Sequence, residues 1–226
     1  MITNRWSKLF MVMLILVCAV ACAHTEVSNR SEIKKYDALS KDCKPRVLIV
    51  YQSKYGSTKQ YAQWIQSDIP SDLADTDTAD TREFAKYDVI VFGSSIRMGR
   101  IVIAPLIIES WDAVKGKKVV LFTTSGTPPE HPNIRKIYQR SLPEGSWKDI
   151  KYFPLHGRMV KNDLSFIDKF LVAIGQIMEK DESIAKRMRE DYDEVKRENL
   201  LPLLEYVKAQ LTGSSGHEFE FSTGQI

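Results

Sequence analysis

Short, uninterrupted apolar runs alternate along the chain with stretches in which apolar residues recur every three or four positions. The runs are rich in β-branched and aliphatic residues, which is typical of strands buried on both faces of a parallel sheet. They predict strands at residues 46–51, 87–93, 118–124 and 150–155, with a further short strand near 71–75.

The intervening stretches predict helices over residues 57–68, 103–114, 132–141, 165–180 and 183–211, the last broken or kinked around Pro202. Strands that alternate with such helices form right-handed βαβ units. We therefore expect an α/β fold with a doubly wound parallel sheet between two helix layers, a three-layer α/β/α arrangement.

Two helical segments near the C-terminus carry distinct patterns. The helix at 165–180 has a strongly apolar side, which predicts packing on the sheet; the alternative is that this side rests on lipid. The mixed charges of residues 179–197 are expected to form the solvated face of a long helix.

The first 22 residues have the pattern of an export signal. Arg5 and Lys8 precede an apolar run at 9–23 that is shorter than the roughly 20 residues a spanning helix needs. The small residues before Cys22 resemble the lipobox of bacterial lipoproteins, which implies lipidation of Cys22. We expect an exported lipoprotein, anchored in the membrane on the periplasmic or cell-surface side. An uncleaved anchor and a simple cleaved signal are the alternatives.

The composition of the rest of the chain indicates its domain organisation and excludes several functions. Residues 23–45 are polar and predict a linker, residues 46–211 predict one domain, and residues 212–226 predict a disordered tail. Cys43 is the last cysteine, so we expect no intramolecular disulfide in the domain, and no Cys/His group has metal-site spacing. A net charge of +3 argues against a dedicated nucleic-acid-binding protein.

Three loops follow predicted strands, at residues 52–58, 94–100 and 125–131. Ligands of open α/β sheets bind at such strand ends. The first loop leads into a helix N-terminus, where free N–H groups attract anions, and Gly56 permits close approach of the backbone. Its hydroxyl groups suggest a mononucleotide phosphate held mainly by neutral donors. Ordinary N-capping by Ser57 is the alternative interpretation.

Two motifs resemble a known family. V-Y-x-S-x-x-G-x-T at 50–58 is similar to the phosphate-loop signature of flavodoxins. Y-D-V-I-V-F-G-S-S-I-R-M-G at 87–99 and L-H-G-R-M at 155–159 resemble a narrower flavodoxin-domain group, which includes the quinone-dependent protoporphyrinogen IX dehydrogenase. The resemblance covers about residues 46–211.

The resemblance implies a flavodoxin-like fold that binds FMN. The FMN phosphate would contact the first loop, at Ser53, Lys54, Tyr55, Gly56, Ser57 and Thr58. The flavin ring would lie between the second loop and the third, at Ser94, Ser95, Ile96, Arg97, Met98, Gly99, Thr124, Ser125, Gly126 and Thr127. Arg97 is the candidate catalytic residue, because a fixed cation can tune reduced flavin or bind an acidic substrate; a solvated loop residue is the alternative.

One departure from electron-transfer flavodoxins concerns the aromatic side chains that stack on the flavin. Ile96 and Met98 stand where an aromatic is expected, and residues 123–129 contain no Tyr or Trp, although Tyr138 or Trp147 could reach the site. We therefore expect a membrane-tethered FMN oxidoreductase whose acceptor is a quinone. The alternatives are an exported electron-transfer flavodoxin that serves a redox partner protein, and a flavin-free interaction domain. The sequence leaves the oligomeric state open.

Overall fold

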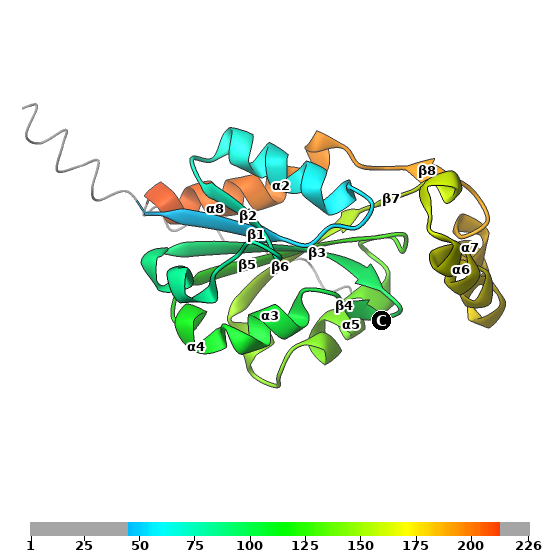
Figure 1. Ribbon diagram of the computed structural model, residues 1–226, viewed down its shortest axis with the longest axis horizontal. Coiled ribbons are helices and arrows are strands. Elements are labelled where there is room, and N and C mark those ends of the chain that lie inside the picture. The colour runs from blue at the N-terminus through cyan, green and yellow to red at the C-terminus, as the bar shows by residue number, and fades with distance from the viewer. Residues whose placement is uncertain (1–44, 213–226) are drawn as a thin grey trace, which may run out of the picture. The chain divides into compact units, whose positions relative to one another are not determined.

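The computed structural model describes residues 45–212 (Figure 1). The predicted signal at 1–22 with Cys22, the linker up to residue 44 and the tail from residue 213 lie outside the described residues.

The described chain forms a parallel sheet with the strand order β2-β1-β3-β5-β6. Its strands are β1 (Val47–Tyr51), β2 (Asp72–Asp75), β3 (Val89–Arg97), β5 (Lys118–Ser125) and β6 (Ile150–His156). A short strand β4 (Arg100–Ile101) turns back antiparallel on the end of β3. The order reverses between β1 and β3, so their carboxyl ends flank the topological switch point at which open α/β sheets bind ligands.

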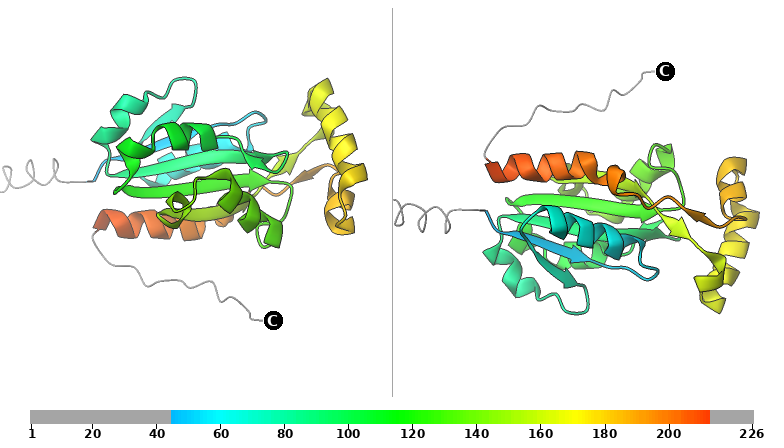
Figure 2. Two further views of the ribbon diagram at one scale, coloured as in Figure 1. Left: turned by 90° about the horizontal axis from the view of Figure 1, so that it is seen from below. Right: turned by 90° about the horizontal axis from the view of Figure 1, so that it is seen from above.

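Helices cover both faces of this sheet (Figures 1 and 2). On one face lie α2 (Ser57–Asp68) and α8 (Leu201–Thr212), which pack with Tyr61, Ile65 and Val207 against the sheet. On the other face lie α3 (Ala104–Glu109), α4 (Trp111–Val114) and α5 (Pro132–Ser141). The 3₁₀ segments η1 (Thr81–Lys86) and η2 (Ser146–Lys148) complete the connections on that face. This arrangement confirms the predicted three-layer α/β/α fold.

Most predicted elements form where the hydrophobic pattern placed them, with small changes at their ends. The helices α2 and α5 have the predicted bounds. The helix predicted at 103–114 is divided into α3 and α4 at Ser110, whose hydroxyl donates to the Leu106 carbonyl at 2.7 Å. Strand β3 extends beyond residue 93 because its end pairs with β4.

The prediction of a nearly continuous helix over 183–211 is wrong. The helix α7 (Glu182–Arg187) is short, and β8 (Tyr192–Asp193) then pairs antiparallel with β7 (Arg158–Met159). The 3₁₀ segment η4 (Arg197–Leu200) leads into α8, in which Pro202 is the second residue. A proline in the first helical turn loses no hydrogen bond, so it begins this helix instead of bending it. The mixed charges of 179–197 therefore do not share one helix face.

The prediction that the apolar side of the helix at 165–180 packs on the sheet is also wrong. The helix α6 (Phe166–Met178), which follows η3 (Lys161–Asp163), lies with α7 beyond the carboxyl ends of the strands, away from both helix layers (Figures 1 and 2). Its large apolar side chains are mostly exposed. Of the helices in the described residues, none is long and apolar enough to cross a membrane.

Candidate functional site

The three predicted loops open into one cavity of about 640 Å³, between the carboxyl ends of the strands and the helices α6 and α7. Ligand pockets typically measure about 300–1,000 Å³, so this volume suits a small-molecule ligand. The predicted residues that line the cavity are Ser53, Lys54, Tyr55, Ser57, Thr58, Ser95, Ile96, Arg97, Met98, Gly99, Thr124, Ser125, Gly126 and Thr127.

Two predicted residues, Gly56 and Ser94, lie outside this lining. Gly56 occupies the N-cap position of α2 with φ 87°, a left-handed conformation that favours glycine. Ser94 is fully buried, and its hydroxyl accepts a hydrogen bond from the Ile103 N–H at 3.1 Å. Both residues therefore shape the loops instead of facing the cavity.

The first loop directs the N-terminus of α2 towards the cavity. Within the described residues no side chain caps this end of the helix, and Gly56, not Ser57, stands at the N-cap. The first N–H groups of α2 are therefore available to an anion. The buried Thr58 hydroxyl lies 3.0 Å from the Thr124 hydroxyl, which joins the first loop to the third.

Four cations also line this cavity, namely Lys54, Arg97, Arg158 and Arg187. A Cβ on Gly56 would lie 3.5 Å from the Arg158 guanidinium, so Arg158 reaches the phosphate-type loop from β7. Arg158 also pairs with Asp193 at 3.1 Å. These side chains add charged hydrogen-bond donors to the neutral donors predicted from the loop alone.

Asp168 of α6 holds two of these cations, and no sequence motif pointed to it. Its buried carboxylate lies 2.7 Å from the Lys54 Nζ, and it also contacts Arg97 and the Tyr55 hydroxyl. Burial favours the protonated acid, but hydrogen bonds from Lys54 and Tyr55 and the charge of Arg97 outweigh it and lower the pKa of Asp168 to about 2. Arg97 is therefore ion-paired, and α6 is tied to the first and second loops.

Tyr192 of β8 supplies the aromatic residue at the third loop that the sequence pattern did not reveal. A Cβ on Gly126 would lie 2.2 Å from the Tyr192 hydroxyl, so the ring rests against this loop and lines the cavity. Tyr138, a candidate for this role from the sequence, is buried instead, and its ring stacks on Tyr152 with centroids 4.1 Å apart. Neither Tyr138 nor Trp147 lines the cavity.

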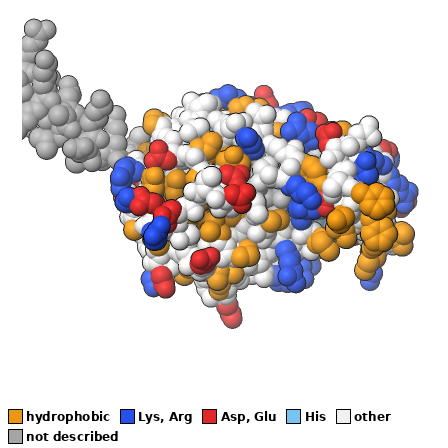
Figure 3. Space-filling model, in the orientation of Figure 1, with side chains coloured by type: hydrophobic (Ala, Val, Ile, Leu, Met, Phe, Trp, Pro, Cys, Tyr) orange, Lys and Arg blue, Asp and Glu red, His pale blue; other side chains and the backbone are white. Residues whose placement is uncertain are grey.

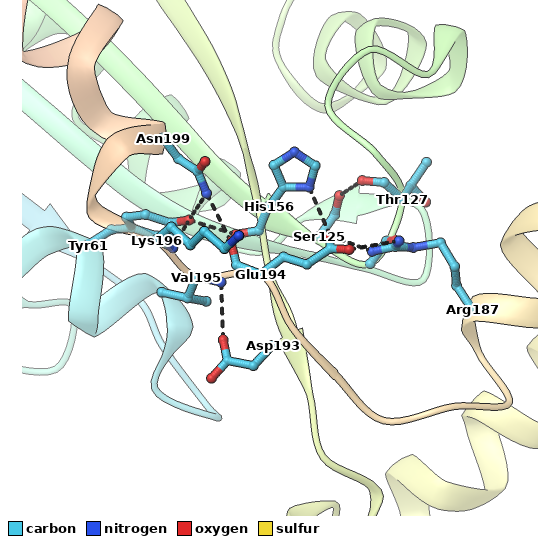
Figure 4. Close-up of polar contacts among 11 residues, drawn as sticks. Tyr61, Ser125, Thr127, His156, Arg187, Asp193, Glu194, Val195, Lys196 and Asn199 are labelled. Carbon is cyan, nitrogen blue, oxygen red and sulfur yellow. Dashed lines mark hydrogen bonds and ion pairs between the residues drawn. The ribbon is translucent and has the colours of Figure 1, made fainter.

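A polar network secures the third loop (Figure 4). The Arg187 guanidinium donates to the Gly126 carbonyl at 2.9 Å and to Glu194 at 2.6 and 3.0 Å. It also lies 4.7 Å from the Tyr192 ring centroid. His156 contacts the same Glu194 carboxylate at 2.9 Å. These contacts hold the segment that carries β8 against the carboxyl end of β5.

The family comparison agrees with the fold of the described residues. The family model for the flavodoxin domain matches residues 48–200. This chain belongs to the flavodoxin domain family. No match was found among curated proteins.

Solved structures similar to this flavodoxin domain share modest sequence identity with it. A flavodoxin from the domain Archaea is 16% identical, with 64% of this chain and 99% of that chain covered and a TM-score of 0.37. The two-electron reduced Megasphaera elsdenii flavodoxin is 23% identical, with 48% of this chain and 82% of that chain covered and a TM-score of 0.39. A flavoprotein in complex with FMN from Lactobacillus acidophilus is 21% identical, with 50% of this chain and 92% of that chain covered and a TM-score of 0.34.

The cavity of this flavodoxin domain has two chemically different ends. Hydroxyl groups and the α2 N-terminus lie at one end, beside Lys54 and Arg158. Apolar side chains of α6 and the segment that follows α7 line the other end, namely Leu171, Val172, Ile174, Met178 and Met188. Such a cavity can hold a ligand with an anionic group at one end and a flat apolar part at the other.

Proposed function

We propose that this flavodoxin domain binds FMN and acts as an oxidoreductase at a membrane. The observation that carries the proposal is the single cavity that joins the uncapped N-terminus of α2 to an apolar wall. The FMN phosphate would contact the α2 N-terminus with the hydroxyls of Ser53 and Ser57, and Lys54 and Arg158 would add positive charge. FMN, when bound, supplies the redox chemistry, and the protein supplies binding, orientation and electrostatics.

The ring would lie between the second and third loops. Gly126 lets Tyr192 approach the third loop closely, and Tyr192 supplies the aromatic surface that the loop itself lacks. Arg97 lines the same part of the cavity and would stabilise negative charge at a reduced ring or at an acidic substrate. The extent of the cavity beyond these loops, as far as Leu171 and Met188, supports an enzyme with its own substrate over a simple electron shuttle.

The proposed substrates follow from this chemistry and from the motif at 87–99. A carboxylate-bearing and otherwise largely apolar reductant such as protoporphyrinogen IX would suit the cations Lys54 and Arg97 and the apolar wall. The proposed acceptor is a quinone. It would be reached because a lipid on Cys22 holds the chain at the membrane, outside the cytoplasm.

The test is the flavin content of the purified full-length chain, measured by absorbance and by chromatography of the released cofactor. We expect close to one FMN per chain. A folded, colourless protein that cannot be reconstituted with FMN would contradict the proposal and favour a flavin-free interaction domain.

Two further measurements separate the finer parts of the proposal. Substrate-dependent quinone reduction is expected of an enzyme, whereas a flavodoxin that only shuttles electrons would show none without a partner. Metabolic labelling with a fatty acid is expected in the wild type and not in the Cys22→Ser variant. Labelling that survives Cys22→Ser would contradict the proposed anchor.

A further inference from the structure

The helix α6 exposes most of its large apolar side chains. Phe166 and Ile177 are each 86% exposed, and Phe170 is 61% exposed. Positions three or four apart lie on the same side of a helix, so these side chains form one continuous surface. We call this surface the α6 patch; its members are Phe166, Ile167, Phe170, Ile174, Ile177 and Met178. Figure 3 shows hydrophobic side chains gathered at the end of the molecule that carries α6.

The opposite side of α6 faces the protein with polar groups and with Leu171 and Val172, which line the cavity. Asp168 is buried in the contacts with Lys54 and Arg97, and the Gln176 side chain donates to the Met188 carbonyl at 2.6 Å. The helix therefore differs from an ordinary surface helix, which buries its large apolar side chains, because α6 leaves most of them exposed. Exposed apolar surfaces of this kind mark sites of interaction with another molecule or a membrane.

Exposed acidic residues flank α6 at Asp163 and Glu182, but the exposed charge within the helix itself is basic and suits an anionic lipid surface. Within α6 the one exposed charged side chain is Lys169, and the exposed Lys180 follows two residues after the helix. The exposed part of α6 carries no carboxylate, because Asp168 is buried. Long lysine side chains at the border of an apolar surface can reach lipid headgroups while the apolar residues enter the membrane.

We propose that the α6 patch docks this domain on the surface of an anionic bilayer. With 13 residues, α6 is about 20 Å long, so it is too short to cross a hydrocarbon core of about 30 Å and would lie flat in the interface. The predicted membrane-proximal run ends at residue 23, and 22 residues separate it from Arg46. A random-coil linker of this length would span roughly 25 Å on average, so even weak affinity of the patch for lipid would suffice for docking.

Docking through this patch would place the cavity at the membrane. Ile174 and Met178 belong to the α6 patch and also line the cavity. A membrane-dissolved quinone could then reach the cavity along one apolar surface. This last step rests on the proposed function, whereas docking itself needs no flavin.

The test is hydrogen–deuterium exchange of the full-length protein, with and without vesicles of phosphatidylglycerol. We expect slower exchange over residues 166–178 with these vesicles, and less slowing with vesicles of phosphatidylcholine alone. The Phe170→Glu and Ile177→Glu variants should lose this protection. The matched controls are Ile108→Glu and Leu201→Glu, because these residues are also large, apolar and exposed but lie on other helices.

The variants distinguish docking through α6 from the effect of the N-terminal anchor and from self-association. An anchor at the N-terminus is the same in every variant, so only the α6 patch can account for a difference between Ile177→Glu and Leu201→Glu. Equal exchange with and without phosphatidylglycerol vesicles overturns the proposal. Protection that appears without lipid and rises with protein concentration also overturns it, in favour of a second copy of the chain. All variants can be measured without FMN, so the exchange experiment tests docking even if the protein does not bind flavin.

Discussion

The Asp168 carboxylate of α6 lies 2.7 Å from the Lys54 Nζ of the first loop. This ion pair joins the helix that carries the α6 patch to the first loop, which is the proposed phosphate site. The same carboxylate contacts Arg97 of the second loop. Asp168 therefore ties α6 to both loops beside the cavity.

We expect the acid sensitivity of the fold to depend on Asp168. Its pKa in the folded protein is about 2, below the ordinary value of 3.8, so its stabilising contribution is complete above pH 3.8 and is lost as the pH falls towards 2. The free energy of unfolding, measured with urea at a series of pH values, should change less between pH 5 and pH 2 in Asp168→Asn than in the wild type.

The control for this measurement is Asp112→Asn. Asp112 also pairs with a lysine, Lys115, but its side chain is 91% exposed. Exposed ion pairs contribute little to stability, so this variant should follow the wild-type profile. Parallel profiles for the wild type and Asp168→Asn would contradict the importance of the Asp168 contacts.

Substitution of Gly56 should lower both the stability of the fold and the affinity for FMN. Its φ of 87° is unfavourable for alanine, so Gly56→Ala should lower the free energy of unfolding by about 1–2 kcal/mol. Gly116, with φ 83° and open space around it, is the matched control for this strain. Both variants should lose similar stability in urea titrations, and only Gly56→Ala should weaken FMN binding. Equal FMN affinity in both variants would place the phosphate elsewhere.

A negative charge at Ser53 should repel the phosphate. Ser53 lines the cavity and is partly exposed, so Ser53→Asp adds a charge at little cost to folding. Like charges a few ångströms apart near a protein surface repel by a few kcal/mol, so we expect at least about tenfold weaker FMN binding by fluorescence titration. Ser53→Asn, of the same size and uncharged, should bind nearly as the wild type does.

The alternative substitution Thr58→Asp is also expected to expel FMN, but it is a less specific test. Thr58 is 1% exposed and its hydroxyl contacts Thr124. A buried carboxylate at this position would destabilise the fold itself. Retention of full flavin occupancy in Ser53→Asp would contradict the assignment of the first loop to the phosphate.

Tyr192 should determine the environment of the bound ring. Aromatic pairs contribute about 0.5–1.5 kcal/mol beyond burial, so Tyr192→Leu should weaken FMN binding by roughly two- to tenfold, and Tyr192→Phe should not. Gly126→Ala should resemble Tyr192→Leu, because its Cβ would displace the Tyr192 hydroxyl. The FMN affinity of each variant is measured from the residual fluorescence of bound FMN. Equal affinities in Tyr192→Leu and Tyr192→Phe would show that the ring lies away from Tyr192.

Much of the layered fold was predictable because its signals are local. The runs that form β1, β3 and β5 are continuous and rich in β-branched residues. Parallel strands place their carboxyl ends at one edge, so the three loops were expected to meet there. The order β2-β1-β3-β5-β6 then brings those loops to one cavity.

The sequence alone therefore determined the five parallel strands, the bounds of α2 and α5, and the loops that form the rim of the cavity, but not the short strands β4, β7 and β8. Only the tertiary structure decided which side of α6 is exposed, which acid pairs with Lys54, and which aromatic rests on Gly126. Hydrophobic periodicity shows that a helix has an apolar side, but it does not show what covers that side. The contacts of Asp168 and Tyr192 with the three loops join segments far apart in the sequence, and such contacts form only when the whole chain packs.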